Sequence, residues 1–265
     1  MIIDFHTHIF PDKIAARSIE QLESASGITA STNGTLQGLL DSMDKNGVDI
    51  SVIMPVVTKT SQFETVNTFA AKVNETYKGK LISFGGIHPD SYDYRTELDR
   101  IKELGIQGIK LHPDYQGVMI DDKRYIDIIR YADELGLIIL VHAGIDIGLP
   151  NPVHCPPKKI KKVIEEIKPG KLILAHMGGW KQWEEVYEFL AGEDVYMDTS
   201  FTFDYIEEEM FLKLLAKHGC DKVLFATDSP WSNSKKTADV IRKLPIADEQ
   251  KKSILFRNAG QLLKL

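Results

Sequence analysis

The sequence predicts a single-domain α/β protein of the TIM-barrel class, a (β/α)8 barrel that spans residues 1–265. Eight short apolar, β-branched runs recur along the chain, and a segment with the apolar spacing of an amphipathic helix follows each run. Strict alternation of strand and helix implies parallel strands joined by right-handed crossovers. Eight such units suit a closed barrel better than an open sheet, and about 250 residues is the usual length of that barrel.

The predicted elements follow one another without a linker or a low-complexity tract. The predicted strands lie in chain order at residues 1–8, 49–56, 80–89, 106–113, 137–144, 171–179, 194–200 and 222–230. Apolar faces with helical spacing lie at residues 36–43, 63–77, 98–104, 125–135, 160–167, 183–190, 206–214, 240–244 and 254–262. Gly47, Gly105 and Gly136 each end a helical pattern just before a strand, where a helix stop is expected.

Two connections are longer than the others, at residues 9–34 and 144–157. Long connections in compact domains are often lids or binding loops. The segment 9–34 is polar and contains glycine, so it has few residues for a core of its own. We therefore expect it to fold over the mouth of the barrel and not to form a separate domain.

Composition limits the partners and the compartment. The net charge of −6 argues against a nucleic-acid surface. No apolar stretch approaches the roughly 20 residues of a membrane helix, and the N-terminus has no signal-peptide pattern. Cys155 and Cys220, the two cysteines, give no disulfide framework and fit a reduced cytoplasm. We expect a cytoplasmic protein whose partner is a small-molecule substrate, with no nucleic acid and no membrane; a homo-oligomer stays open.

The histidines gather where the predicted strands end. Six of the eight histidines occupy such positions, namely His6, His8, His88, His112, His142 and His176, and Asp228 ends the eighth strand. Barrel active sites lie at this rim and draw residues from several strands. His6 and His8 are two residues apart on one strand, so their side chains share a face. Imidazoles and a carboxylate brought together in this way predict a divalent metal site.

The rim motifs also resemble a known family. They are "DFHTH", "LVHAG", "LAHMGG", "FATDSPW" and "RNAGQLL", in that order along the chain. The set resembles the amidohydrolase superfamily, in particular the amidohydrolase-related branch that includes amino-carboxymuconate-semialdehyde decarboxylase. The resemblance covers most of the chain, and the set as a whole is more specific than any one motif.

The resemblance implies a role for each rim residue. His6 and His8 would be metal ligands from the first strand, and His142 would be the ligand from the fifth strand. His176 would be either a ligand of a second metal or the acid/base histidine beside a single metal. Asp228 would be a ligand that also takes the proton of the attacking water.

Three further residues have open roles. Lys110 lies where dinuclear members of the superfamily carry a carboxylated lysine that bridges two metals, but it could instead hold a substrate carboxylate as a cation. His112 shares a strand face with Lys110 and is a candidate substrate-binding residue. His88 either binds substrate or closes a turn before Pro89. Asp198 is expected to orient a neighbouring group or cap a helix, and not to bind metal.

These residues predict a metal-dependent enzyme with one or two divalent ions, zinc by default, with manganese or iron also compatible with imidazole and carboxylate ligands. The expected reaction is hydrolysis of a C–N or C–O bond in a small amide, lactone or cyclic imide by a metal-activated water, with Asp228 and His176 as catalytic residues. The alternative is non-oxidative decarboxylation of an unsaturated or aromatic carboxylic acid. The intact set of candidate ligands argues against a binding protein that has lost catalysis.

Overall fold

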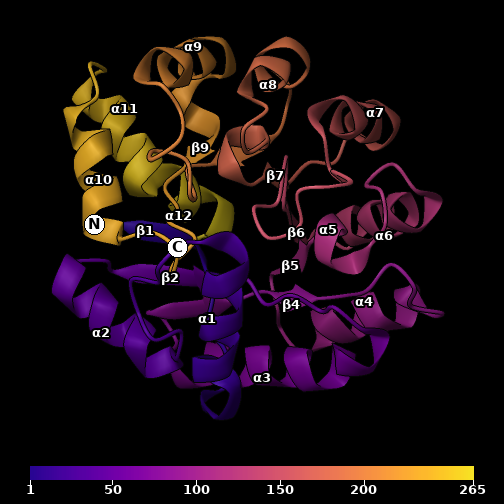
Figure 1. Cartoon of the computed structure of the whole chain (residues 1–265). Helices are drawn as coiled ribbons and strands as arrows, with labels where there is room; N and C mark the ends of the chain where they lie inside the picture. The colour runs from indigo at the N-terminus through magenta and orange to yellow at the C-terminus, as the bar shows by residue number, and fades with distance from the viewer.

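A computed structural model describes residues 1–265 and shows a parallel β-barrel ringed by helices (Figure 1). The strands are β1 (Ile3–Thr7), β2 (Ile50–Ile53), β3 (Leu81–Ser83), β4 (Gly85–Gly86), β5 (Gly108–Leu111), β6 (Ile138–Val141), β7 (Leu172–Leu174), β8 (Tyr196–Asp198) and β9 (Val223–Leu224). Each of the eight predicted runs contains a strand, and the third run contains both β3 and β4. The predicted (β/α)8 barrel is confirmed.

Two junctions close the barrel: one between β3 and β4, and one between the first strand, β1, and the last strand, β9. β3 pairs with β2 and β4 pairs with β5, and only Phe84 separates β3 from β4. The Phe84 N–H donates to the carbonyl of Ile53 at 2.9 Å, so pairing continues through the interruption. At the seam, the Phe5 N–H of β1 donates to the carbonyl of Phe225, just past β9, at 2.9 Å. The first and last strands are therefore neighbours.

A buried asparagine on α3 (Phe63–Thr76) supports the short strand β4. The Asn67 amide accepts from the Gly86 N–H at 3.0 Å and donates to the Gly86 carbonyl at 2.9 Å, so it replaces a strand neighbour. A β-carbon on Gly85 would lie 2.3 Å from the Asn67 amide oxygen, which requires glycine there. Asn67 thus fixes the strand that leads to the rim beside Lys110, because Gly86 pairs with Lys110 in β5.

Asn67→Ala is expected to lower the free energy of unfolding by about 2–4 kcal/mol, because an unpaired buried N–H or C=O costs about 1–3 kcal/mol. Thr68→Ala is the matched control, since Thr68 is the exposed neighbour on the same helix and its loss should cost at most about 0.5 kcal/mol. Urea denaturation measures both. Equal losses of unfolding free energy in the two variants would show that the hydrogen bonds between Asn67 and Gly86 do not stabilise the barrel.

The helices surround the barrel in chain order. They are α1 (Asp12–Ser26), α2 (Leu36–Asn46), α3, α4 (Tyr94–Glu103), α5 (Pro113–Gln116), α6 (Lys123–Glu134), α7 (Pro157–Ile167), α8 (Trp183–Phe189), α9 (Glu208–His218), α10 (Ser234–Lys243), α11 (Asp248–Lys252) and α12 (Asn258–Leu263). A helix lies at or overlaps each predicted apolar face. No helix is long and apolar enough to span a bilayer.

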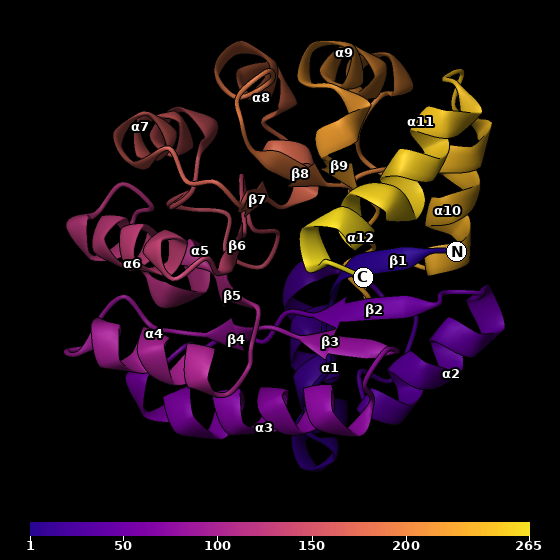
Figure 2. The same ribbon diagram turned by 180° about the vertical axis from the view of Figure 1, so that it is seen from behind.

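Two apolar clusters fill the molecule, one on each side of the strands. Alternate strand residues such as Phe5, Val52 and Leu140 pack together inside the barrel with Leu262 and Leu263 of α12. The remaining strand side chains pack outward against the ring of helices. Figure 2 shows α12 across the back of the barrel, and Figure 1 shows α1 in front of it. Because α12 closes one end, a cavity can open only at the other.

The connection 9–34 consists of the helix α1, which was not predicted, and two short linkers. Ala15, Ile19 and Leu22 of α1 recur at the spacing of an amphipathic helix, although only Ala15 is buried. The Ser31 N–H donates to the carbonyl of Pro230 at 2.7 Å, which holds the end of this segment against the rim. As predicted, the segment folds over the mouth: it lines the same cavity as His6 and His8.

Candidate active site

A cavity of about 1020 Å³ opens at the carboxyl ends of the strands. Most of the candidate site residues line it, namely His6, His8, Lys110, His112, His142, His176 and Asp228. His88 does not line this cavity. Its Nδ1 accepts from the Asp90 N–H at 3.1 Å, which is the turn-closing contact considered for it. We therefore leave His88 out of the site proposed below.

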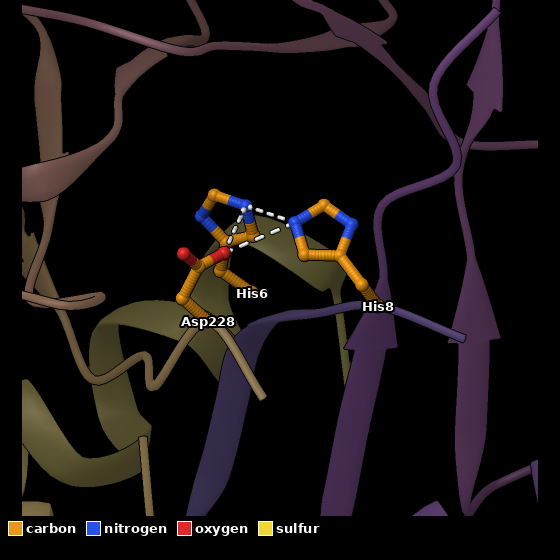
Figure 3. A group of neighbouring side chains, drawn as sticks. All are labelled: His6, His8 and Asp228. Carbon is orange, nitrogen blue, oxygen red and sulfur yellow. Dashed lines mark hydrogen bonds and ion pairs between the residues drawn. The ribbon is translucent and has the colours of Figure 1, made fainter. Parts of the chain in front are cut away.

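His6, His8 and Asp228 form a compact group of potential metal ligands (Figure 3). The His6 Nε2 and His8 Nε2 atoms are 3.1 Å apart, and Oδ1 of Asp228 lies 3.3 Å from the first and 3.0 Å from the second. Ligand bonds of about 2.0–2.1 Å in tetrahedral directions place neighbouring ligand atoms roughly 3.3 Å apart. The spacing of the three donor atoms therefore fits a single ion.

The protonation of His6 favours the same assignment. Burial, with a contribution from Lys110, lowers the pKa of His6 to about 4, so the ring is neutral at pH 7. Its Nδ1 lies 2.9 Å from the carboxylate of Asp198 and carries the ring's proton there. Nε2 therefore carries a lone pair, which faces the other two donors and Nζ of Lys110. A histidine held in this way by a carboxylate is the usual arrangement behind a metal ligand.

Asp198 also holds a second part of the site. Its Oδ1 accepts from the backbone N–H groups of His176 and Ser200, both at 3.0 Å. Burial raises the pKa of Asp198, but His6 and His176 outweigh burial and bring the pKa to about 2. Asp198 is thus a buried, ionised residue that orients its neighbours, which is the role expected from the sequence.

Asp228 is held as a carboxylate in a strained backbone position. Burial raises its pKa, but His6, His8 and His176 outweigh burial and keep the pKa below its usual range. Its φ of 61° and the φ of 59° at His176 lie in the left-handed region, which is costly for residues other than glycine. The Asp228 N–H donates to the carbonyl of His6 at 2.8 Å, so the barrel seam fixes the carboxylate beside the first strand.

His176 and His142 form a pair next to the three-donor group. The His176 Nδ1 donates to the carbonyl of Ser200 at 2.9 Å, so its Nε2 is free to accept. That Nε2 lies 3.0 Å from Nδ1 of His142. The His176 ring centre is 5.6 Å from that of His6 and 4.8 Å from that of His142. The expected ligand His142 thus lies beyond His176 and outside the three-donor group.

A second group of potential ligands consists of His112, His142 and Asp146. The rings of His112 and His142 are stacked, with centres 4.2 Å apart and planes 8° from parallel. A bound ion lies in the plane of each imidazole ligand, and two stacked planes cannot both contain it. The geometry therefore argues against a metal here. Nε2 of His112, 3.5 Å from Asp146, is instead a polar group available to a substrate.

Two acidic residues at this second group were not predicted. Asp146 lies in the long connection 144–157, whose length was the one available signal. Asp114 follows the "HP" of the fourth predicted strand and accepts from the N–H and the ring of His154, both at 3.0 Å. Its other oxygen and the Nε2 of His142 are buried without partners, 3.8 Å apart.

Lys110 supplies the positive charge at the floor of the cavity. It is the one lysine or arginine among the lining residues, and its side chain is fully buried. Its Nζ lies 3.0 Å from Nε2 of His6, within the three-donor group. Burial lowers the pKa of Lys110 to about 8, against the opposing effect of Asp228 and Asp198. The amine thus remains mostly protonated at pH 7.

Comparison with known proteins agrees with the motif set. The family model described as "Amidohydrolase" matches residues 3–265. The chain belongs to the amidohydrolase family. The barrel of this amidohydrolase is thus that of an enzyme family. A search of curated proteins found no match.

Solved structures share the fold of this amidohydrolase at low sequence identity. An uncharacterised TIM-barrel protein from Bordetella bronchiseptica is 19% identical, with a TM-score of 0.81, over 99% of this chain and 98% of that one. 2,6-Dihydroxybenzoate decarboxylase, solved with 2,6-dihydroxybenzoate, is 16% identical, with a TM-score of 0.72, over 100% of this chain and 99% of that one. 5-Carboxyvanillate decarboxylase from Novosphingobium aromaticivorans, solved with manganese and a nitrobenzoic acid, is 15% identical, with a TM-score of 0.75, over 100% of this chain and 96% of that one.

Proposed function

We propose that this amidohydrolase is a metal-dependent, non-oxidative decarboxylase of an aromatic or unsaturated carboxylic acid. The observation that carries the proposal is the buried ammonium of Lys110, 3.0 Å from a lone pair of the metal-ligand group. A substrate carboxylate that reaches this group meets both a cation and the metal. The structural neighbours named as benzoate and vanillate decarboxylases favour this reaction over the hydrolysis that we expected first.

His6, His8 and Asp228 would hold one divalent ion, with their donor atoms 3.0–3.3 Å apart. Manganese, already a candidate beside zinc and iron, is bound in structures of two decarboxylase neighbours. When bound, the ion supplies a Lewis acid that fixes and polarises the oxygen atoms of the substrate. His142 and His176 would lie beside these three residues, in the same cavity.

The residues of the protein would then bind the substrate carboxylate and deliver one proton to the substrate carbon. Lys110 pairs with the substrate carboxylate and keeps it apart from the carboxylate of Asp228. The C–C bond to the carboxyl group breaks, carbon dioxide leaves, and the electron pair stays on the ring or vinyl carbon. That carbon forms a C–H bond with a proton delivered by Asp228 or His176, which take it up from a substrate hydroxyl or from water.

The proposal is tested by incubating the manganese-loaded and zinc-loaded protein with 2,6-dihydroxybenzoate and with 5-carboxyvanillate. We expect carbon dioxide and the corresponding phenol in equal amounts, and no reaction after chelation of the metal. Turnover of amides, lactones or cyclic imides without release of carbon dioxide from any carboxylic acid would refute the decarboxylase and support the hydrolase.

Lys110→Gln is expected to raise the KM for a carboxylate substrate at least about tenfold, because a charged hydrogen bond contributes about 1.5–3 kcal/mol, while one ion per chain stays bound. The exposed Lys80→Gln is the control and should change neither quantity. Steady-state kinetics and elemental analysis measure them. If the wild type binds two ions and Lys110→Gln binds fewer, Lys110 is a carboxylated bridge and not a substrate cation.

A further inference from the structure

The cavity extends away from the metal-ligand group into a space between two helices. Figure 1 shows α1 in front of the barrel and α3 along its lower side. α1 contributes Ile14, Ser18, Gln21, Leu22, Ala25 and Ser26, and α3 with the turn before it contributes Ser61, Gln62, Thr65, Val66 and Phe69. Each set recurs at intervals of three or four residues, so one face of each helix lines this arm of the cavity.

The arm carries no formal charge. Apart from histidine, the ionisable side chains with a charge that line the cavity are Lys110, Asp146 and Asp228. Lys110 lies 3.0 Å from His6 and Asp228 lies 3.0 Å from His8, both at the floor of the cavity, and Asp146 of the connection 144–157 lies 3.5 Å from His112. The two helix faces offer only apolar groups, hydroxyls and amides. A ligand portion placed there gains by removing apolar surface from water and pairs with no charge.

The helices leave this space to a ligand. α1 buries only Ala15 against the protein, while Ile14 is 50% exposed and Phe69 of α3, which lines the same cavity, is 38% exposed. The cavity of about 1020 Å³ lies at the upper end of the roughly 300–1,000 Å³ usual for ligand pockets. A single benzoate ring at the floor would leave most of this volume empty.

We infer that the substrate is an amphiphilic carboxylic acid whose carboxylate lies at the floor and whose uncharged, apolar arm lies between α1 and α3. This inference rests on the proposed function for the carboxylate end. The arm itself rests on the two uncharged helix faces and on the size of the cavity. An alkyl chain or a second ring in line with the carboxylate has the chemistry that fits.

Two synthetic probes, 2,6-dihydroxybenzoate and 4-hexyl-2,6-dihydroxybenzoate, test the proposed apolar arm of the substrate. Their binding to the manganese-loaded protein is measured by calorimetry. A buried methylene contributes about fourfold in affinity, and ordering of the chain offsets part of this. We therefore expect the hexyl compound to bind at least about 30-fold more tightly. Equal or weaker binding of the hexyl compound, or no binding of either compound, would overturn the inference.

A matched pair of variants tests where the hexyl group of the probe binds. Ala25→Asp places a charge on the cavity face of α1, and Ala16→Asp places the same charge on an exposed position of that helix that does not line the cavity. Ala25→Asp should reduce the preference for the hexyl compound at least about tenfold, and Ala16→Asp should leave it unchanged. Equal effects of the two variants would contradict this placement.

The binding assay separates this inference from the proposed reaction. If the hexyl compound binds more tightly through Ala25 but neither compound releases carbon dioxide, the apolar arm stands and the decarboxylase is refuted. If both compounds are decarboxylated with the same affinity, the reaction stands and the arm is refuted.

Discussion

Asp228→Asn is expected to lose turnover by about 10²–10⁴-fold, the usual contribution of a positioned acid or base, while the KM changes little. The amide keeps the shape of the side chain but cannot carry the proton that the carbon needs. Asparagine also tolerates the left-handed φ of 61° at this position, so the fold should be retained. Steady-state kinetics on metal-loaded protein measure the turnover and the KM, and thermal denaturation measures whether the fold is retained.

The alternative role for Asp228 is a turn cap, for which the same change would cost roughly 1 kcal/mol of stability and leave the rate intact. Asp204→Asn is the control, because Asp204 is an exposed partner of Lys236 and stands outside the large cavity. A wild-type rate in Asp228→Asn with a modestly lowered melting temperature would refute the proposed chemistry but not the barrel.

The double variant His6→Ala, His8→Ala is expected to lose the metal and all measurable turnover while keeping its fold. Two of the three closely spaced donor atoms disappear, and one carboxylate cannot hold the ion alone. The barrel interior and the layer between strands and helices do not depend on the metal, because apolar side chains fill both. Elemental analysis, activity assays and circular dichroism measure the three outcomes.

His88→Ala is the matched control for metal binding, since His88 ends a strand run like the others but does not line the cavity. It should retain the metal of the wild type. Loss of metal from His88→Ala, or retention of metal by the double variant, would contradict the assignment of the ligands.

The sequence was sufficient for the barrel and for the rim, because parallel strands place all their carboxyl ends at one edge. That topology alone brings His6 and Asp228 together across 222 residues of chain. The amino-acid pattern does not specify which rim residues face the cavity. Both faces of a barrel strand are buried, so the alternation of polar and apolar residues that marks a half-exposed strand is lost. His112 was favoured as a substrate-binding residue because of Lys110, and His88 stayed open between substrate binding and turn closure; only His112 lines the cavity.

The parts that escaped sequence analysis depend on contacts between distant segments. Asp146 reaches His112 from a long connection whose path no local pattern specifies. The helix α1 was not predicted because most of its residues are polar and its inward face lines a cavity and not a core. That uncharged inward face is also what led to the proposed apolar arm of the substrate.

The most direct test of a metal-dependent decarboxylase is the origin of the new bonds in the product. The reaction is run with 2,6-dihydroxybenzoate in D₂O and, separately, in ¹⁸O-labelled water, and the products are analysed by NMR and mass spectrometry. The proposal predicts one deuterium on the carbon that carried the carboxylate for each carbon dioxide released, no ¹⁸O in the phenol, and no reaction without metal. Incorporation of ¹⁸O into a new carboxylate from an amide or lactone, with carboxylic acids left unchanged, would contradict it.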